Sequence, residues 1–217
     1  MSHHPKSLHA KLQALVDGAA LQGKVYFITG GSRGLGRGVA ARALSLGARV
    51  YVTGRTVSDA MEAEIIEEAR ALSPSRMSAT PRVSALQLDL GSLDDVAYAV
   101  RTLRAAGVSI DVLVLNAGLY PSRAAVTRQG FELSIGVNCV GHHVLTQGML
   151  AAGLLRPAAR MVVITSETHR VAEPLNVRAV CGTTAAPPLL PVPQASTTTH
   201  TSMRRHASHA KARNDAY

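Results

Sequence analysis

The sequence predicts an α/β fold in which helices cover both faces of a doubly wound parallel sheet. Two patterns lead to this prediction. Short apolar, β-branched runs alternate along the chain with longer helical stretches, and a glycine-rich turn joins the first run to the first helical stretch. Alternation of this kind indicates βαβ units. Because crossovers between parallel strands are right-handed, such units build one twisted sheet with helices on both faces.

The elements follow one another in regular order from residue 24. The expected strands are residues 25–29, 50–53, 83–88, 112–115 and 161–165. The expected helices between them are residues 35–46, 58–72, 92–106 and 132–154. Ser58 and Ser92 are expected to cap the second and third of these helices, since a serine side chain accepts a hydrogen bond from a free N–H group of the first turn. The expected sheet therefore has five strands, and the pattern stops after the fifth.

Composition limits the class of protein. The 217 residues, 47% hydrophobic and 17% charged, are typical of one globular domain. Two cysteines cannot form a disulfide framework, and no targeting peptide or bilayer-length apolar run is visible, so a soluble cytoplasmic protein is expected. The net charge of +9 is dispersed, without a Lys/Arg run or metal-ligand spacing. We therefore expect no nucleic-acid partner, no membrane span and no metal.

Three segments are predicted along the chain. Residues 1–22 form an N-terminal extension, and residues 23–170 form the folded domain. Residues 171–217 contain prolines, threonines and alanines but sustain neither the strand period nor the helix period. This last segment is predicted to be a disordered or aberrant tail.

The glycine-rich turn lies between the first strand and the first helix. In this context Gly30 permits a tight turn, Gly34 lets the backbone approach a pyrophosphate, and Gly36 permits close packing of helix on strand. The free N–H groups and the positive dipole end of the new helix attract phosphate. The turn predicts a dinucleotide site, which makes the expected fold a Rossmann-type doubly wound parallel sheet, truncated after the fifth strand. The expected cofactor-binding residues of the turn are Thr29, Gly30, Ser32, Arg33, Gly34, Leu35 and Gly36.

The end of the second strand predicts which nucleotide binds. Sites for NAD place an acidic residue there to bind the ribose hydroxyls, whereas this strand ends Thr53-Gly54-Arg55. Arg55 and Arg33 together are suited to a 2′-phosphate, because a planar guanidinium pairs well with phosphate oxygens. The sequence therefore predicts NADP(H) as the cofactor.

The spacing Thr29-Gly30-x-x-x-Gly34-x-Gly36 resembles that of the short-chain dehydrogenase/reductase family. Asn116-Ala117-Gly118, after the fourth strand, is similar to the family's Asn-Asn-Ala-Gly element. Residues 130–146 are similar to the retinol-dehydrogenase-like branch, and the resemblance extends from residue 23 to residue 169.

The resemblance implies a role for several residues. Asp89, with Leu90 beside it, corresponds to the position that contacts adenine, although a plain position at the start of a helix is the alternative. Asn138 corresponds to the catalytic asparagine whose backbone holds a proton-relay water, and Ser166 to the serine that hydrogen-bonds the substrate oxygen. The implied reaction is hydride transfer between NADP(H) and a small-molecule carbonyl or alcohol substrate, with a lipophilic one among the options. His142 and His143 are expected to pack or to face solvent rather than to do chemistry, and His169 is expected in a loop near the site.

The family's Tyr-x-x-x-Lys pair is not found in this chain. Residues 176–196, where it is expected, contain neither Tyr nor Lys, and the later Tyr217 is the last residue. We therefore expect hydride transfer to be crippled here, and the alternative is a non-catalytic NADP(H)-binding or interaction protein. The change in composition near residue 170 suggests a frameshift, an alternative splice or a retained intron, with a natural short form as the other option. The oligomeric state stays open because the helix that usually forms the dimer is also missing.

Overall fold

The structure is a computed structural model that describes residues 21–73 and 80–167. The predicted tail 171–217, most of the predicted extension 1–22, and His169 lie outside the described residues. The described strands are β1 (Val25–Ile28), β2 (Arg49–Gly54), β3 (Val83–Gln87), β4 (Ile110–Leu115) and β5 (Leu155–Val163). The described helices are α2 (Gly34–Ser45), α3 (Asp59–Leu72), α4 (Leu93–Ala105), α5 (Leu133–Ile135), the π-helical segment η1 (Gly136–Gly141) and α6 (His142–Ala151).

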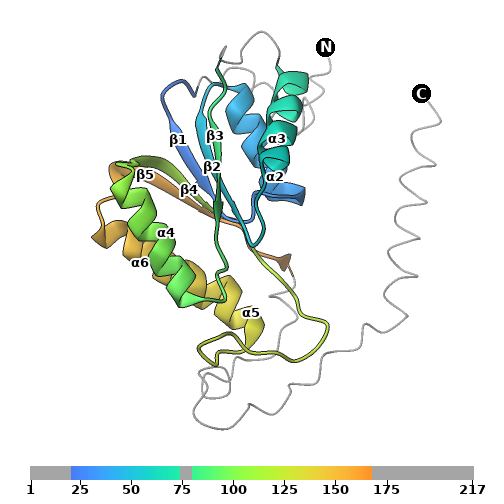
Figure 1. The fold of residues 1–217 in the computed structure, drawn as a ribbon, viewed down its shortest axis with the longest axis vertical. Helices are drawn as coiled ribbons and strands as arrows, with labels where there is room; N and C mark the ends of the chain where they lie inside the picture. Colours follow the sequence, from blue (N-terminus) through green and yellow to red (C-terminus); the bar gives the residue numbers. More distant parts are fainter. Residues whose placement is uncertain (1–20, 74–79, 168–217) are drawn as a thin grey trace, which may run out of the picture.

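The five strands form one parallel sheet in the order β3-β2-β1-β4-β5. Helices α2 and α3 cover one face, and α4 and α6 cover the other (Figure 1). The chain therefore runs outward from β1 to β3, returns across the sheet to β4 and continues to β5. This topology confirms the predicted doubly wound fold, and β5 is the last strand in the described residues.

The core lies in two layers, one on each face of the sheet. Neighbouring residues of a strand point to opposite faces, so Phe27 packs with the residues of α4 and α6, whereas Ile28 packs with those of α2 and α3. Both side chains are fully buried. The central strands read as continuous apolar runs because both of their faces are covered.

The predicted helix caps are confirmed. The side chain of Ser58 accepts a hydrogen bond from the backbone N–H of Met61, and that of Ser92 accepts one from Asp95. Acidic residues follow in the first turn of both helices, where they stabilise the positive end of the helix dipole.

Two boundaries differ from the sequence-based expectation by more than two residues. The fifth strand begins at Leu155 rather than Met161, and its pairing with β4 jumps from Ile110↔Leu155 to Val112↔Arg160, so the intervening residues form a bulge. This bulge contains Pro157, which has no N–H to donate and broke the strand pattern in the sequence. The expected helix 132–154 ends at Ala151 and includes the π-helical segment η1. None of the helices in the described part of the chain is both long and apolar enough to cross a membrane.

Candidate functional site

A pocket of about 580 Å³ opens at the carboxyl ends of β1 to β4. This is the position where an open α/β sheet binds ligands, at the point where the strand order reverses. Twelve of the residues predicted to bind the cofactor line it: Gly30, Ser32, Arg33, Gly34, Leu35, Gly36, Arg55, Asp89, Leu90, Asn116, Ala117 and Gly118. The thirteenth, Thr29, lies beneath the pocket and is buried.

The glycine turn forms one wall of the pocket. Gly30 has a φ of +65°, and a Cβ there would lie 2.9 Å from the Cα of Ala117. A Cβ on Gly36 would collide with the carbonyl oxygen of Gly30 and the side-chain amide of Asn116. Both positions therefore require glycine, which agrees with the turn and packing roles expected from the sequence.

Helix α2 differs from α3 and α4 at its amino end. Its N-cap residue, Arg33, makes no side-chain capping bond, and its first turn has no acidic residue. The other two helices have a serine cap and acidic residues in this position. The first N–H groups of a helix need partners, and at α2 they lie beside the pocket. The chain thus leaves the positive end of this helix available to an anion.

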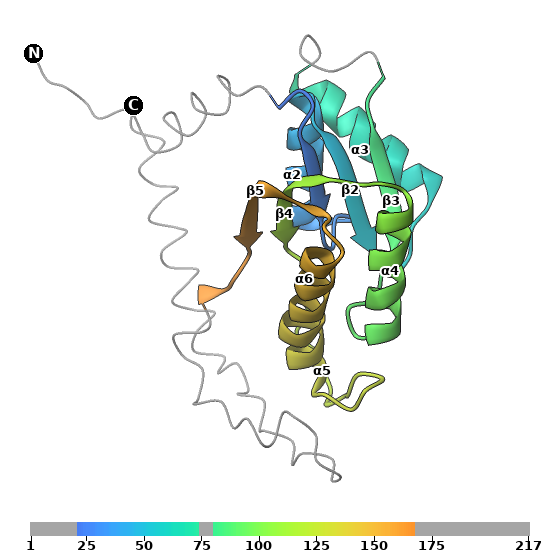
Figure 2. The same cartoon turned by 90° about the vertical axis from the view of Figure 1, so that its left-hand side faces the viewer.

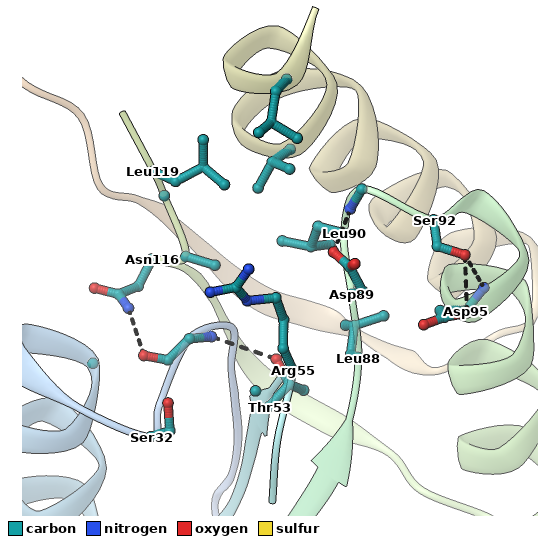
Figure 3. A pocket seen from close by; sticks show the side chains of 18 of the residues that line it. Ser32, Thr53, Arg55, Leu88, Asp89, Leu90, Ser92, Asp95, Asn116 and Leu119 are labelled. Carbon is teal, nitrogen blue, oxygen red and sulfur yellow. Dashed lines mark hydrogen bonds between the residues drawn. The ribbon is translucent and has the colours of Figure 1, made fainter. Parts of the chain in front are cut away.

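Two arginines add positive charge to the same wall. Arg33 and Arg55 both line the pocket, both are exposed, and neither forms an ion pair with another described residue. Figure 3 shows the Arg55 side chain extending from the end of β2 into the pocket. A guanidinium without a carboxylate partner is a ready ligand for a phosphate group.

Asp89 holds the loop between β3 and α4. Its Oδ1 accepts a hydrogen bond of 2.9 Å from the backbone N–H of Gly91 (Figure 3). The cap of α4 is Ser92, three residues later, so Asp89 belongs to the loop rather than to the helix. Its position on the pocket wall fits a polar contact with a bound ligand.

Asn116 ties the end of β4 to the glycine turn. Its Nδ2 donates to the carbonyl oxygens of Thr29, at 2.9 Å, and Gly30, at 3.2 Å. The side chain therefore fixes the shape of the turn, while Ala117 and Gly118 present backbone to the pocket.

Thr29 is the centre of a buried hydrogen-bond network. Its Oγ1 accepts hydrogen bonds from the backbone N–H groups of Asn116, at 2.9 Å, and Ala117, at 3.0 Å. The same oxygen lies 2.9 Å from Nε2 of His142. Nδ1 of His142 lies 2.9 Å from the carbonyl oxygen of Asn138. Burial lowers the pKa of His142 below 6.5, and its bond to the Asn138 carbonyl only partly opposes this shift.

Asn138 and Ser166, the two expected catalytic residues, do not line the pocket. The side-chain amide of Asn138 forms two 2.9 Å bonds with Leu119: Oδ1 accepts from its N–H, and Nδ2 donates to its carbonyl. Asn138 therefore holds the loop that follows β4. Ser166 is exposed and comes shortly after β5. The N–H of Ile164 donates to Leu115, so Ser166 follows at the same carboxyl edge of the sheet as Asn116.

Further lining residues were not predicted from the sequence. They come mainly from strand ends and from the loop before α5: Thr53, Gly54, Leu88, Gly91, Ser92, Asp95, Leu119, Val126, Thr127, Arg128, Leu133 and Val137. Thr53 could have been found, because it ends the second strand beside Arg55, and its Oγ1 accepts from the N–H of Gly30. Thr127 and Arg128 lie in a loop without a periodic pattern, so the sequence contains no comparable signal for them.

Comparison with known proteins agrees with this architecture. The family described as short chain dehydrogenase matches residues 24–178. Human retinol dehydrogenase 14 is 35% identical over 162 residues, which cover 71% of this chain and 48% of that protein. Polyprenol dehydrogenase from Danio rerio is 36% identical over 155 residues, covering 68% and 44%. A solved short chain dehydrogenase from Burkholderia cenocepacia J2315 in complex with NADP is 32% identical, with a TM-score of 0.54, over 71% of this chain and 60% of that one.

These matches define the class of protein. The chain belongs to the short-chain dehydrogenase family, whose members are oxidoreductases built on a nicotinamide-nucleotide-binding Rossmann fold. Within that family it is similar to retinol dehydrogenase 14 and polyprenol dehydrogenase. It spans just under half the length of these two curated relatives.

Proposed function

We propose that this chain binds NADP(H) in the pocket at the carboxyl ends of β1 to β4. The observation that carries the proposal is the pair Arg33 and Arg55, both on the pocket wall and neither paired with a carboxylate of the described residues. In this arrangement the arginines bind the 2′-phosphate, the start of α2 binds the pyrophosphate, and Asp89 contacts the adenine. The nicotinamide end then lies toward Ala117 and Gly118.

Calorimetry with matched variants tests the cofactor preference. NADPH is expected to bind more tightly than NADH, and Arg55→Asp is expected to narrow or reverse the difference because it sets a carboxylate against the 2′-phosphate. Arg82→Asp is the control. It makes the same change of charge on an exposed arginine just before β3. This position lies at the amino ends of the strands, whereas the pocket lies at their carboxyl ends. Equal affinity of the unmutated chain for both cofactors, or equal effects of the two substitutions, would refute the preference.

We further propose that the whole protein transfers a hydride between NADP(H) and a carbonyl or alcohol substrate. Bound NADPH supplies the hydride. In this proposal Ser166 orients the substrate oxygen, and Asn138 supports the proton relay while its side chain holds the loop at Leu119. The similarity to proteins named retinol dehydrogenase and polyprenol dehydrogenase favours a lipophilic substrate.

For the 217-residue chain by itself we propose cofactor binding without efficient turnover. General acid–base catalysis contributes about 10²–10⁴-fold, and this sequence contains no Tyr-x-x-x-Lys pair after Ser166. Reduction of a panel of aldehydes and ketones, including retinaldehyde, is therefore expected to stay near the uncatalysed rate while NADPH still binds. Rapid NADPH oxidation that disappears in Ser166→Ala would contradict this proposal and point to a substitute acid in the chain.

A further inference from the structure

The network around Thr29 has a hydrogen-bond direction that the structure determines. The carbonyl oxygen of Asn138 can only accept, so Nδ1 of His142, 2.9 Å away, must carry a proton and donate it. A neutral imidazole with its proton on Nδ1 has an unprotonated Nε2, which is an acceptor. Neutral His142 is thus held in one tautomer by the backbone of the π-helical segment.

The tautomer of His142 in turn sets the direction of the Thr29 hydroxyl. Nε2 of His142 accepts, so the hydroxyl donates its single proton across the 2.9 Å contact. Both lone pairs of the hydroxyl oxygen are then free to accept, and the N–H groups of Asn116 and Ala117 lie 2.9 and 3.0 Å away. The one donor site and the two acceptor sites of the Thr29 hydroxyl are then all used. Another acceptor, the carbonyl of Val114, lies at a longer 3.4 Å.

We propose that His142 is a positioning residue for the nicotinamide half of the cofactor, acting through Thr29. Its Nε2 accepts a hydrogen bond from the Thr29 hydroxyl, and so directs both oxygen lone pairs of Thr29 at the backbone that forms the pocket floor after β4. This proposal rests on the NADP(H) site proposed above and assigns to it a residue that lines no part of the pocket. The exposed neighbour His143 has no such place in the network.

Loss of the Nε2 acceptor is expected to redirect the hydroxyl toward Val114, the alternative acceptor. The N–H groups of Asn116 and Ala117 then lose a well-aligned partner. Leaving a buried donor unsatisfied carries a desolvation penalty. We expect this penalty to appear as looser binding at the nicotinamide end, with the affinity for NADPH falling at least about tenfold, which is about 1.4 kcal/mol. The adenine end, at Arg55 and Asp89, keeps its geometry.

The affinity test uses the full chain, two probes and three variants. The probes are NADPH and 2′,5′-ADP, which carries only the adenine half. His142→Leu is expected to weaken NADPH at least about tenfold and 2′,5′-ADP less than about twofold. His142→Gln, which can offer an oxygen near the position of Nε2, is expected to restore most of the NADPH affinity. His143→Leu is the control and is expected to change neither affinity.

A spectroscopic test of the unmutated chain does not depend on whether the variants fold. ¹⁵N-labelled histidine should give, for His142, a neutral imidazole signal with the proton on Nδ1, assigned through its connectivity to the backbone of the unmutated chain. A proton on Nε2 at neutral pH overturns the proposal, as does an equal loss of both ligands in His142→Leu or no loss of either. A chain that binds neither ligand refutes the NADP(H) site itself and the positioning role with it. A chain that binds both, without the differential effect, refutes only the positioning role.

Discussion

Strands β4 and β5 are neighbours that pair residue by residue, yet their surroundings differ. The β4 residues Leu113, Val114 and Leu115 are 0%, 3% and 6% exposed, whereas their register partners Met161, Val162 and Val163 on β5 are 46%, 42% and 57% exposed. Both stretches are apolar. Strand β4 has a strand on each side, while β5 lies at the edge of the sheet in the described part of the chain (Figure 2). The surroundings of each strand, rather than its apolar sequence, decide the burial.

The same contrast separates the two halves of the proposed active site. The residues that line the cofactor pocket lie at or after the carboxyl ends of β1 to β4, or in α2, α4, α5 and η1. Ser166, the residue proposed to orient the substrate, follows the exposed strand β5. The cofactor-binding half of the proposed site is therefore well packed in the described residues, whereas Ser166 in the substrate-binding half follows β5, the most exposed strand.

Matched truncations of two paired valines test this contrast most strongly. Val114→Ala removes buried methyl groups and is expected to lower the free energy of unfolding by about 2 kcal/mol. Val162→Ala makes the same change on the register partner and is expected to cost less than about 1 kcal/mol. Urea unfolding of both variants measures the difference. If Val162→Ala is as destabilising as Val114→Ala, then β5 is covered in solution.

Asp111 links the amino end of β5 to the rest of the sheet, so a substitution of Asp111 tests how this end is held. Its carboxylate accepts from the N–H of Val25 at 2.9 Å and pairs with Lys24 and Arg156, the latter at the start of β5. Burial alone would raise the pKa of Asp111, but the Val25 hydrogen bond and the Lys24 ammonium outweigh it and lower the pKa below 3.8. Charged hydrogen bonds of this kind contribute about 1.5–3 kcal/mol.

The sign of this pH dependence follows from the lowered pKa. The unfolded chain takes up the proton first, so the stabilisation is present above pH 3.8 and is lost as the pH falls through the lower folded-state pKa. Asp111→Asn is expected to cost about 1–2 kcal/mol at pH 7 and much less near pH 2. Urea midpoints of both proteins across this range measure the effect. A difference that stays constant with pH would mean that the charge of Asp111 contributes nothing.

His142 adds a second, smaller pH dependence, confined to the well-packed half. Its pKa is lowered in the folded state, mainly by burial. The unfolded chain therefore binds the proton more readily, and stability falls as the pH drops below 6.5. Removing the group in His142→Gln is expected to flatten this decline between pH 7.5 and 5.5, while His143→Gln leaves it unchanged. An identical decline in both variants would assign the effect to other groups.

Because β5 is exposed and apolar, we expect it to promote association between chains rather than to lower the free energy of unfolding. Exposed apolar strand edges promote association between chains, and a lysine there opposes it. Val163→Lys is expected to slow aggregation several-fold while changing the unfolding free energy by less than about 0.5 kcal/mol. Leu72→Lys, on an exposed apolar residue of α3, is the control and is expected to have little effect. Light scattering during incubation at a fixed protein concentration compares the three chains.

Local signals in the sequence predicted most of the fold. Ser58 and Ser92 indicate helix starts because their side chains accept hydrogen bonds from N–H groups only three residues away. The glycine turn predicts the pocket because its residues are consecutive in the sequence, and because only glycine permits the backbone conformation and close packing that the turn requires. The sequence predicts a start of the fifth strand that is too late, since Arg156 and Pro157 interrupt the apolar pattern and only pairing with β4 allows the bulge.

Other features depend on contacts that no local pattern encodes. The bond between Thr29 and His142 joins residues far apart in the chain and exists only when α6 packs beside β1 and β4. The π-helical segment around Asn138 has no distinctive residue pattern of its own. The sequence correctly placed Asn138 on a helix. It did not indicate that the side chain would hold Leu119.

Hydrogen–deuterium exchange of the full chain, with and without NADPH, tests the central claim most directly. NADPH is expected to protect the backbone amides of residues 30, 32–36, 54–55, 89–91 and 117–119, which lie on the pocket wall, and to leave residues 155–163 of β5 unchanged. Without ligand, β5 is expected to exchange faster than β4, because its outer edge carries N–H groups without a neighbouring strand in the described residues. Protection confined to β5, or none at all at saturating NADPH, would contradict the account.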